Sequence, residues 1–305
     1  MAKFRQNHSK ASKGNSFAIR GLILTLILIG ALLFGFYKIN AYLQTDQSPS
    51  NSNNGYIPVP SSDIDFIPKG KNENIIHHKY FSLAYNESNE QADWVAYKLT
   101  KQSLLMPNVK RSKSFLPDYD VKTRSAYHRD YTNSGYTRGH LAPAGDMAFN
   151  EKAMQESFFM SNMCPQLRAF NNAVWRELEE NVRNWAFENE EIYVVSGPVF
   201  YNKVRKRIGE NKVAVPDAFF KVILDIKTPS SKSIGFLIPH EKTDKHLKEF
   251  AVAIDYIEKL VQLDLFPELY EDVDQENRIE STMNSSKWKF DQQRFRARVE
   301  KWNYE

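Results

Sequence analysis

The segment from Ser134 to Met147 (SGYTRGHLAPAGDM) contains side chains that could act on a phosphodiester bond. The guanidinium of Arg138 can bind a phosphate. The imidazole of His140, with an ordinary pKa of about 6.5, can accept a proton from water at neutral pH. Residues two apart in an extended segment project from the same face, so Arg138 and His140 would face one substrate. Gly139 would let the backbone approach a ligand without a Cβ in the way.

A second group of polar residues follows further along the chain, in Ser161–Gln166 (SNMCPQ) and at Asn171 and Glu179. Phosphodiester hydrolysis needs a positioned water and neutralised charge on the phosphate oxygens. Mg²⁺ supplies the charge, prefers oxygen ligands and keeps several waters. We therefore expect Asn171 to bind Mg²⁺, with Mn²⁺ as an alternative ion. We expect Glu179 to accept a hydrogen bond from a water of the ion's shell.

Hydrophobic periodicity predicts the elements that position these residues. Trp175, Leu178, Val182 and Trp185 repeat at helical spacing, which predicts a core-facing helix over 172–186 with Asn171 as its N-cap. On such a helix Asn171 and Glu179 would line the same side. A further helix is predicted at 250–260, and apolar or alternating runs predict strands at 77–85, 94–100, 191–196, 219–226 and 234–238. The expected fold is α+β, with a central, mostly antiparallel sheet flanked by helices.

Charge is unevenly distributed along the sequence. The net charge is +4, but residues 1–20 contribute +5, so the remainder is −1 and is not globally basic. Residues 98–140 form a local basic stretch, and a second basic loop at 203–212 could also contact nucleic acid. In 98–140, three aspartates oppose nine basic residues: Lys98, Lys101, Lys110, Arg111, Lys113, Lys122, Arg124, Arg129 and Arg138.

Cysteine and histidine patterns exclude some other sites. Cys164 is the single cysteine, which excludes an intrachain disulfide and a zinc site made of cysteines. His77 and His78 are adjacent, and neighbours on a strand point to opposite faces, so we do not expect them to share a metal.

The N-terminal region predicts a membrane anchor. Gly21–Tyr37 is seventeen residues without a charge, and flanking residues extend the apolar segment to 21–43. This length is just enough to span a bilayer core of about 30 Å. The preceding basic tail, 1–20, favours a cytoplasmic N-terminus. We therefore expect a transmembrane helix and a folded domain outside the cytoplasm, periplasmic or extracellular, with a cleaved secretion signal as the alternative.

The remaining sequence divides by composition. Residues 44–74 are rich in Ser, Asn and Pro and predict a flexible linker, residues 75–280 predict the catalytic domain, and residues 281–305 predict a basic aromatic tail. That tail could contact nucleic acid or pack on the domain as an amphipathic helix, and packing is the preferred interpretation. The sequence leaves the oligomeric state open.

The paired segments resemble the DNA/RNA non-specific endonuclease family, whose signature is Asp-Arg-Gly-His followed by x-x-Pro. Here the corresponding residues are Thr137-Arg138-Gly139-His140-Leu141-Ala142-Pro143. The family's second block is matched by Ser161, Asn162, Pro165, Gln166, Asn171, Trp175 and Glu179. The segments Asp93–Lys98, Gly197-Pro198 and Pro216–Lys221 are also similar, so that the resemblance covers roughly residues 75–270.

The resemblance implies a ββα-metal active site that cleaves DNA and RNA with little sequence specificity. It implies that His140 is the general base, that Asn171 is the direct Mg²⁺ ligand and that Glu179 supports water on the ion. It further implies that Arg138 and Arg111 stabilise the phosphate and the leaving group, and that Asn162 orients the site.

One residue departs from the family signature. Thr137 stands where the signature has Asp, so any tuning by that carboxylate is absent. The base and the metal ligand are retained. The alternative function is a membrane-tethered module that binds nucleic acid through the basic stretch without cutting it.

Overall fold

The computed structural model describes residues 66–70, 74–201, 205–227 and 230–304. The chain divides into two units, Met1–Pro58 and Val59–Glu305, and all described residues belong to the second. The predicted basic tail and anchor, 1–43, lie outside the described residues. Within the described ranges, no helix is long and apolar enough to cross a membrane.

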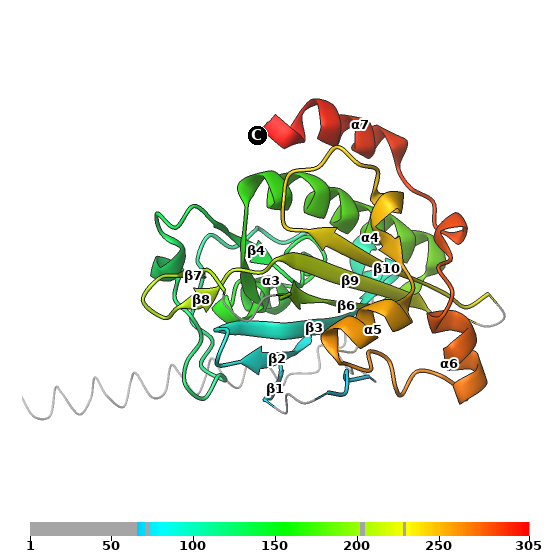
Figure 1. Ribbon diagram of the computed structural model, residues 1–305, viewed down its shortest axis with the longest axis horizontal. Coiled ribbons are helices and arrows are strands. Elements are labelled where there is room, and N and C mark those ends of the chain that lie inside the picture. Colours follow the sequence, from blue (N-terminus) through cyan, green and yellow to red (C-terminus); the bar gives the residue numbers. More distant parts are fainter. Residues whose placement is uncertain (1–65, 71–73, 202–204, 228–229, 305) are drawn as a thin grey trace, which may run out of the picture. The chain divides into compact units, whose positions relative to one another are not determined.

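A seven-stranded sheet forms the centre of the second unit (Figure 1). Each pair of neighbouring strands is antiparallel, which confirms the predicted type of sheet. In spatial order the strands are β1 (Ile75–His77), β2 (Ser82–Asn86), β3 (Gln91–Thr100), β6 (Glu191–Val199), β9 (Ala218–Asp225), β10 (Lys232–Pro239) and β11 (Ala251–Val252).

Helices cover both faces of this sheet. On β6, Val194 and Val195 point to opposite faces, and each is fully buried in a different apolar cluster. The cluster with Val194 includes Trp185 of α4 (Arg176–Asn189). The cluster with Val195 includes Ile257 of α5 (Ile254–Val261) and Ile279 of α6 (Val273–Glu280). Burial on both faces explains why the central strands are continuous apolar runs rather than alternating ones.

Two small sheets and several short helices complete the described fold. β4 (Thr137–His140) pairs with β5 (Met163–Gln166), and β7 (Arg207–Ile208) pairs with β8 (Val213–Ala214). The remaining helices are α2 (Lys101–Leu105), η2 (His128–Tyr131), α3 (Glu151–Ser157), η3 (Met160–Asn162), η4 (Phe170–Trp175), η5 (Leu247–Phe250), η6 (Ser285–Lys287), α7 (Gln292–Glu300) and η7 (Trp302–Tyr304).

The structure refines three sequence predictions. The strand predicted at 77–85 is two strands, since the chain turns where the His78 N–H donates to the Phe81 carbonyl. Phe66, inside the segment predicted as linker, is fully buried in the core. In the predicted tail, Trp288 packs against Trp185 with ring centroids 5.0 Å apart, in agreement with a segment that packs on the domain.

Candidate active site

The candidate site is built on a strand, strand, helix unit made of β4, β5 and α4. The two strands are antiparallel, with His140 opposite Met163 and Thr137 opposite Gln166. A six-residue π-helical segment, η4, joins β5 to α4 and carries Asn171. Single π-helical turns occur frequently at functional sites. This unit has the ββα order that the resemblance implied.

A cavity of about 430 Å³ opens between this unit and the segment before it. We call it the catalytic pocket. It brings together five of the six predicted site residues, which lie up to 68 positions apart in the sequence: Arg111, Arg138, His140, Asn171 and Glu179.

His140 lies in the wall of this pocket and is 8% exposed. Its ring makes an edge contact with Phe158 at 4.8 Å, and among the described residues its buried Nε2 has no hydrogen-bond partner. Burial, with the nearby charge of Arg111, lowers the pKa of His140 to about 3. The imidazole is therefore neutral at physiological pH, which is the form that can accept a proton.

Asn171 is oriented by the residue that departs from the family signature. Its Nδ2 donates to Thr137 Oγ1 at 3.1 Å, and that hydroxyl donates to the Gln166 carbonyl at 2.9 Å. With the amide nitrogen directed to Thr137, Oδ1 is the atom that Asn171 can present to the pocket. An amide oxygen is a suitable ligand for a hard cation such as Mg²⁺.

Glu179, in the wall of the pocket, and the buried Lys221 each affect the pKa of the other. Lys221 is 0% exposed, and its Nζ donates to the Leu141 carbonyl at 3.3 Å and lies 4.9 Å from the Trp175 ring centroid. Burial raises the pKa of Glu179 to about 7, and the charge of Lys221 opposes that rise. Burial lowers the pKa of Lys221 to about 8, and Glu179 opposes that fall. Each group therefore stabilises the charged form of the other.

The two predicted phosphate-binding arginines lie over aromatic rings at the pocket. The Arg138 guanidinium is 4.8 Å from the centroid of Phe115, and that of Arg111 is 5.1 Å from the centroid of Phe158. Burial lowers the pKa of both guanidiniums, and both keep their charge at neutral pH. The rings hold the two cations beside His140, where a phosphate would be neutralised.

Asn162, the sixth predicted residue, is fully buried and is not among the residues that line the pocket. Its Oδ1 accepts from the Ala142 N–H at 2.9 Å, and its Nδ2 donates to the carbonyls of Ala142 and Ser157. Its own carbonyl accepts from the Leu141 N–H at 3.0 Å. Asn162 therefore fixes the backbone that follows His140, in keeping with a residue that orients the site.

Two sequence interpretations need correction. Asn171 is not an N-cap, because the helical segment begins at Phe170 and the Asn171 N–H already donates to the Leu167 carbonyl. Gly139 is needed by a neighbouring side chain of the protein, because a Cβ there would lie 2.1 Å from the side chain of Gln166. Helical periodicity alone does not show at which residue a helix begins. The approach of Gly139 to Gln166 depends on the pairing of β4 with β5.

Other charged residues of the site were not predicted. Arg176 and Arg183 also line the catalytic pocket. Arg183 Nη1 donates to Asp146 Oδ1 at 2.8 Å, and the hydroxyl of Tyr97 donates to Asp146 Oδ2 at 2.8 Å. A sequence signal existed for Arg183, which lies one helical turn after Glu179 and so on the same side of α4.

Two other groups of side chains in the described part of the chain could also hold a metal ion. One consists of His78, Asp118 and Asp120, and the other of Asp255, Glu258 and Glu280. Neither includes a residue of the catalytic pocket. In the first group Asp118 already accepts hydrogen bonds from His78 and from Ser161.

Known proteins similar to this chain are nucleases by name. The chain is 34% identical to "Nuclease EXOG, mitochondrial" of Homo sapiens over 204 residues, which are 62% of this chain and 55% of that protein. It is 31% identical to "Mitochondrial nuclease" of Saccharomyces cerevisiae over 281 residues, 81% of this chain and 85% of that protein. The chain thus spans little more than half the length of EXOG and most of the length of the yeast nuclease.

A solved structure shares the fold. The crystal structure of a complex of EndoG with EndoGI, described as showing the mechanism of EndoG inhibition, superposes with a TM-score of 0.60 at 30% identity. The match covers 64% of this chain and 86% of that one. This similarity supports the mixed α/β fold with its large antiparallel sheet.

The predicted location is corrected by these comparisons. Human EXOG and the yeast relative are named as mitochondrial nucleases, so the prediction of a membrane-anchored domain outside the cytoplasm is wrong. The physical reason is that a basic, acid-poor N-terminus also characterises mitochondrial targeting segments, so charge and hydropathy alone did not separate the two cases.

The profile of the family described as DNA/RNA non-specific endonuclease matches residues 64–272, which is more than half of the chain. The matched range contains β4, β5, α4 and each of the six predicted site residues. The chain belongs to the DNA/RNA non-specific endonuclease family.

Proposed function

We propose that this protein is a Mg²⁺-dependent endonuclease that hydrolyses phosphodiester bonds of DNA and RNA with little sequence preference. The observation that carries the proposal is the catalytic pocket, which joins a neutral histidine, four arginines, the amide of Asn171 and the carboxylate of Glu179. Family membership and the printed names of the relatives support the same reaction.

In the proposed reaction His140 accepts a proton from the attacking water. A general base of this kind accelerates hydrolysis by about 10²–10⁴-fold. Arg138 and Arg111 bind the oxygens of the scissile phosphate, where negative charge increases in the transition state. Asn162 keeps the backbone beyond His140 in place, which preserves the position of the base.

The donor set suits a hard divalent cation. Asn171 would hold it through Oδ1, and Glu179 would accept hydrogen bonds from the waters around it. When bound, Mg²⁺ neutralises phosphate charge and stabilises the leaving oxygen. Mn²⁺, which takes similar oxygen ligands, is the proposed substitute.

For the organisation of the chain, we propose that the catalytic domain extends beyond 75–280 at both ends. The buried Phe66 supports an earlier start. The buried Arg298, which pairs with Glu177 of α4, supports the inclusion of residues from 281–305.

The test is cleavage of plasmid DNA and of RNA by the full chain, with Mg²⁺ or with a chelator. We expect both substrates to be cut only with the ion, and Asn171→Ala to need at least about tenfold more Mg²⁺. Asn277→Ala, an exposed asparagine on α6, is the matched control and should behave as the wild type. Cutting that persists in chelator would contradict the proposal, as would nucleic-acid binding without any cutting.

A further inference from the structure

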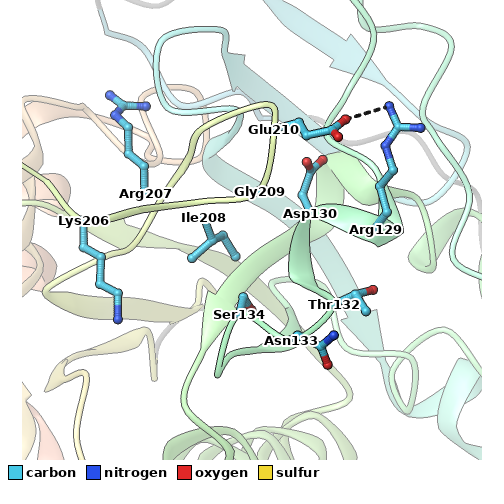
Figure 2. Close-up of a pocket in the computed structure, with 10 residues that line it drawn as sticks. All are labelled: Arg129, Asp130, Thr132, Asn133, Ser134, Lys206, Arg207, Ile208, Gly209 and Glu210. Carbon is cyan, nitrogen blue, oxygen red and sulfur yellow. Dashed lines mark ion pairs between the residues drawn. The ribbon is translucent and has the colours of Figure 1, made fainter.

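A second cavity, of about 410 Å³, lies between the η2 region and the β7 region (Figure 2). We call it the outer pocket. Side chains from the η2 region and from the β7 region line it, including Arg129, Thr132, Asn133, Ser134, Lys206 and Glu210. It contains none of the predicted catalytic residues.

Lys206 is the cation in this pocket best placed for a ligand. Figure 2 shows the side chains of Lys206 and Arg207 on opposite sides of the backbone, with Lys206 on the side of Ser134. Arg207 already donates to the carbonyls of Ser88 and Lys212. Lys206 is exposed, its Nζ lies 4.8 Å from the ring centroid of Tyr136, and within the described ranges it forms no ion pair.

Arg138, which lines the catalytic pocket, reaches the backbone beside the outer pocket. Arg138 Nη1 donates to the carbonyl of His128, the neighbour of Arg129, at 3.5 Å. Tyr136 precedes Arg138 by two residues, so the two side chains lie on the same face of extended chain. His140 lies four positions after Tyr136, which is at most about 13 Å along extended chain. A nucleic-acid strand spans such a distance with a few nucleotides.

Three cations that line the two pockets each lie over an aromatic ring. The pairs are Arg111 with Phe158, Arg138 with Phe115, and Lys206 with Tyr136. Cations held over rings in this way can contact phosphates of a nucleic-acid strand. Arg111 and Arg138 line the catalytic pocket, and Lys206 lines the outer pocket.

We propose that the outer pocket binds a second backbone phosphate of the nucleic-acid strand whose scissile phosphate lies in the catalytic pocket. Lys206 binds that phosphate, and the ring of Tyr136 holds Lys206 in place. This inference rests on the proposed nuclease function and adds a contact a few nucleotides from the cleavage site.

Glu210 gives the outer pocket an opposing charge. Its carboxylate lies 3.3 Å from Arg129 Nη2, and the side chains of both residues are mostly exposed (Figure 2). An exposed pair of this kind contributes little to stability, so it can be removed without loss of the fold. Glu210→Gln would remove the ion pair of Arg129, so that Arg129 could also contact a phosphate in the outer pocket. We therefore expect Glu210→Gln to strengthen binding of a phosphate.

The test measures binding without cleavage. In the full chain carrying His140→Ala, the dissociation constant of a labelled single-stranded DNA of about 20 nucleotides is measured by fluorescence anisotropy between about 50 and 200 mM salt. Adding Lys206→Ala should weaken binding about threefold to tenfold and reduce the slope of log K against log salt by about 0.7, the value for one lost phosphate contact. Glu210→Gln should change binding in the opposite direction.

The matched control is Lys248→Ala. Lys248 is also exposed, its Nζ lies 5.3 Å from the ring centroid of Phe290, and it lies outside the basic stretch 98–140. It should change neither the affinity nor the slope. The effect of Lys206→Ala should also disappear with a dinucleotide, whose single internucleotide phosphate cannot fill both pockets.

Two results would overturn the inference in distinguishable ways. If Lys206→Ala binds the long DNA with the same slope as Lys248→Ala, the second phosphate site is absent while the proposed function stands. If the His140→Ala protein binds no nucleic acid and the wild type cuts none, both proposals fail together.

Discussion

His140 and His78 occupy similar surroundings and differ in one respect. Each residue is 8% exposed, and each ring packs against one of two consecutive phenylalanines, Phe158 for His140 and Phe159 for His78. His78 Nε2 lies 3.0 Å from the Asp118 carboxylate, whereas among the described residues His140 Nε2 has no hydrogen-bond partner.

The hydrogen bonds of the two sites indicate different roles. Burial alone would raise the pKa of Asp118, but hydrogen bonds from His78 and Ser161 outweigh burial and lower it. That cluster is satisfied within the protein and joins the segment after β1 to the loop before η2. His140 lies in the wall of a cavity with cations and an amide oxygen around it. A buried histidine with partners holds the fold together, and one without them is available to a substrate.

The largest expected effect separates the two histidines by activity. His140→Ala should lower kcat by about 10²–10⁴-fold, because the general base is lost, and should leave the melting temperature nearly unchanged. His78→Ala should leave kcat of the folded protein near the wild-type value. It should cost about 1–3 kcal/mol of stability, because the buried Asp118 carboxylate loses a partner. Cleavage rates and thermal melts of both variants measure these effects. Equal loss of activity in the two variants would contradict different roles for the two histidines.

The next effect concerns the cation beneath the pocket. Lys221→Met keeps the length of the side chain but removes the charge that opposes the rise in the pKa of Glu179. The pKa of Glu179 should then rise above about 7, so that its carboxylate form is lost at higher pH. We expect the acid limb of the activity profile to move to higher pH by about one unit, which costs up to about tenfold in rate near pH 7. Lys221→Arg, which keeps the charge, should retain the original limb.

A smaller effect is expected at Thr137. Thr137→Val removes the hydroxyl that accepts from Asn171 and donates to Gln166, while keeping the shape of the side chain. Asn171 would lose its fixed orientation, so the Mg²⁺ concentration for half-maximal activity should rise several-fold, with kcat at saturating Mg²⁺ almost unchanged. An unchanged Mg²⁺ requirement would show that the hydroxyl does not orient the ligand.

The last expected effect is on the pH dependence of stability. Because the pKa of His140 falls to about 3 in the folded state, the unfolded chain binds a proton between about pH 6.5 and pH 3 that the folded chain does not. This difference destabilises the fold as pH falls through that window, by at most about 1.4 kcal/mol per pH unit. His140→Ala should therefore lose less stability than the wild type on acidification, as measured by denaturant unfolding at several pH values. A parallel loss in both proteins would contradict a neutral, buried His140.

Local sequence patterns predicted much of the architecture. The strands predicted at 191–196 and 234–238 lie within β6 and β10, and the one predicted at 219–226 matches β9 to within one residue at each end, since continuous apolar runs identify buried strands. The motif residues Arg138, His140, Asn171 and Glu179 were named from short spacings, and the structure brings all four to one pocket. Their catalytic roles remain proposals.

Contacts between distant segments were not predictable from those patterns. His78 and Asp118 are 40 positions apart, and Lys221 and the Leu141 carbonyl are 80 positions apart. Such pairs depend on the sheet order and on the register of β9, which local periodicity does not specify. The N-terminal charge pattern failed for another reason, because a basic, acid-poor N-terminus is compatible with a membrane anchor and with a mitochondrial targeting segment.

The most direct test of the account is where the metal ion binds. Mn²⁺ binding, followed by water-proton relaxation, should be compared in the wild type, in Asn171→Ala and in Asp120→Ala, a mostly exposed member of the His78 cluster. The account predicts that Asn171→Ala weakens Mn²⁺ binding by about tenfold or more, whereas Asp120→Ala leaves it unchanged. Weaker binding in Asp120→Ala together with wild-type binding in Asn171→Ala would place the ion at the His78 cluster and contradict the assignment of the active site.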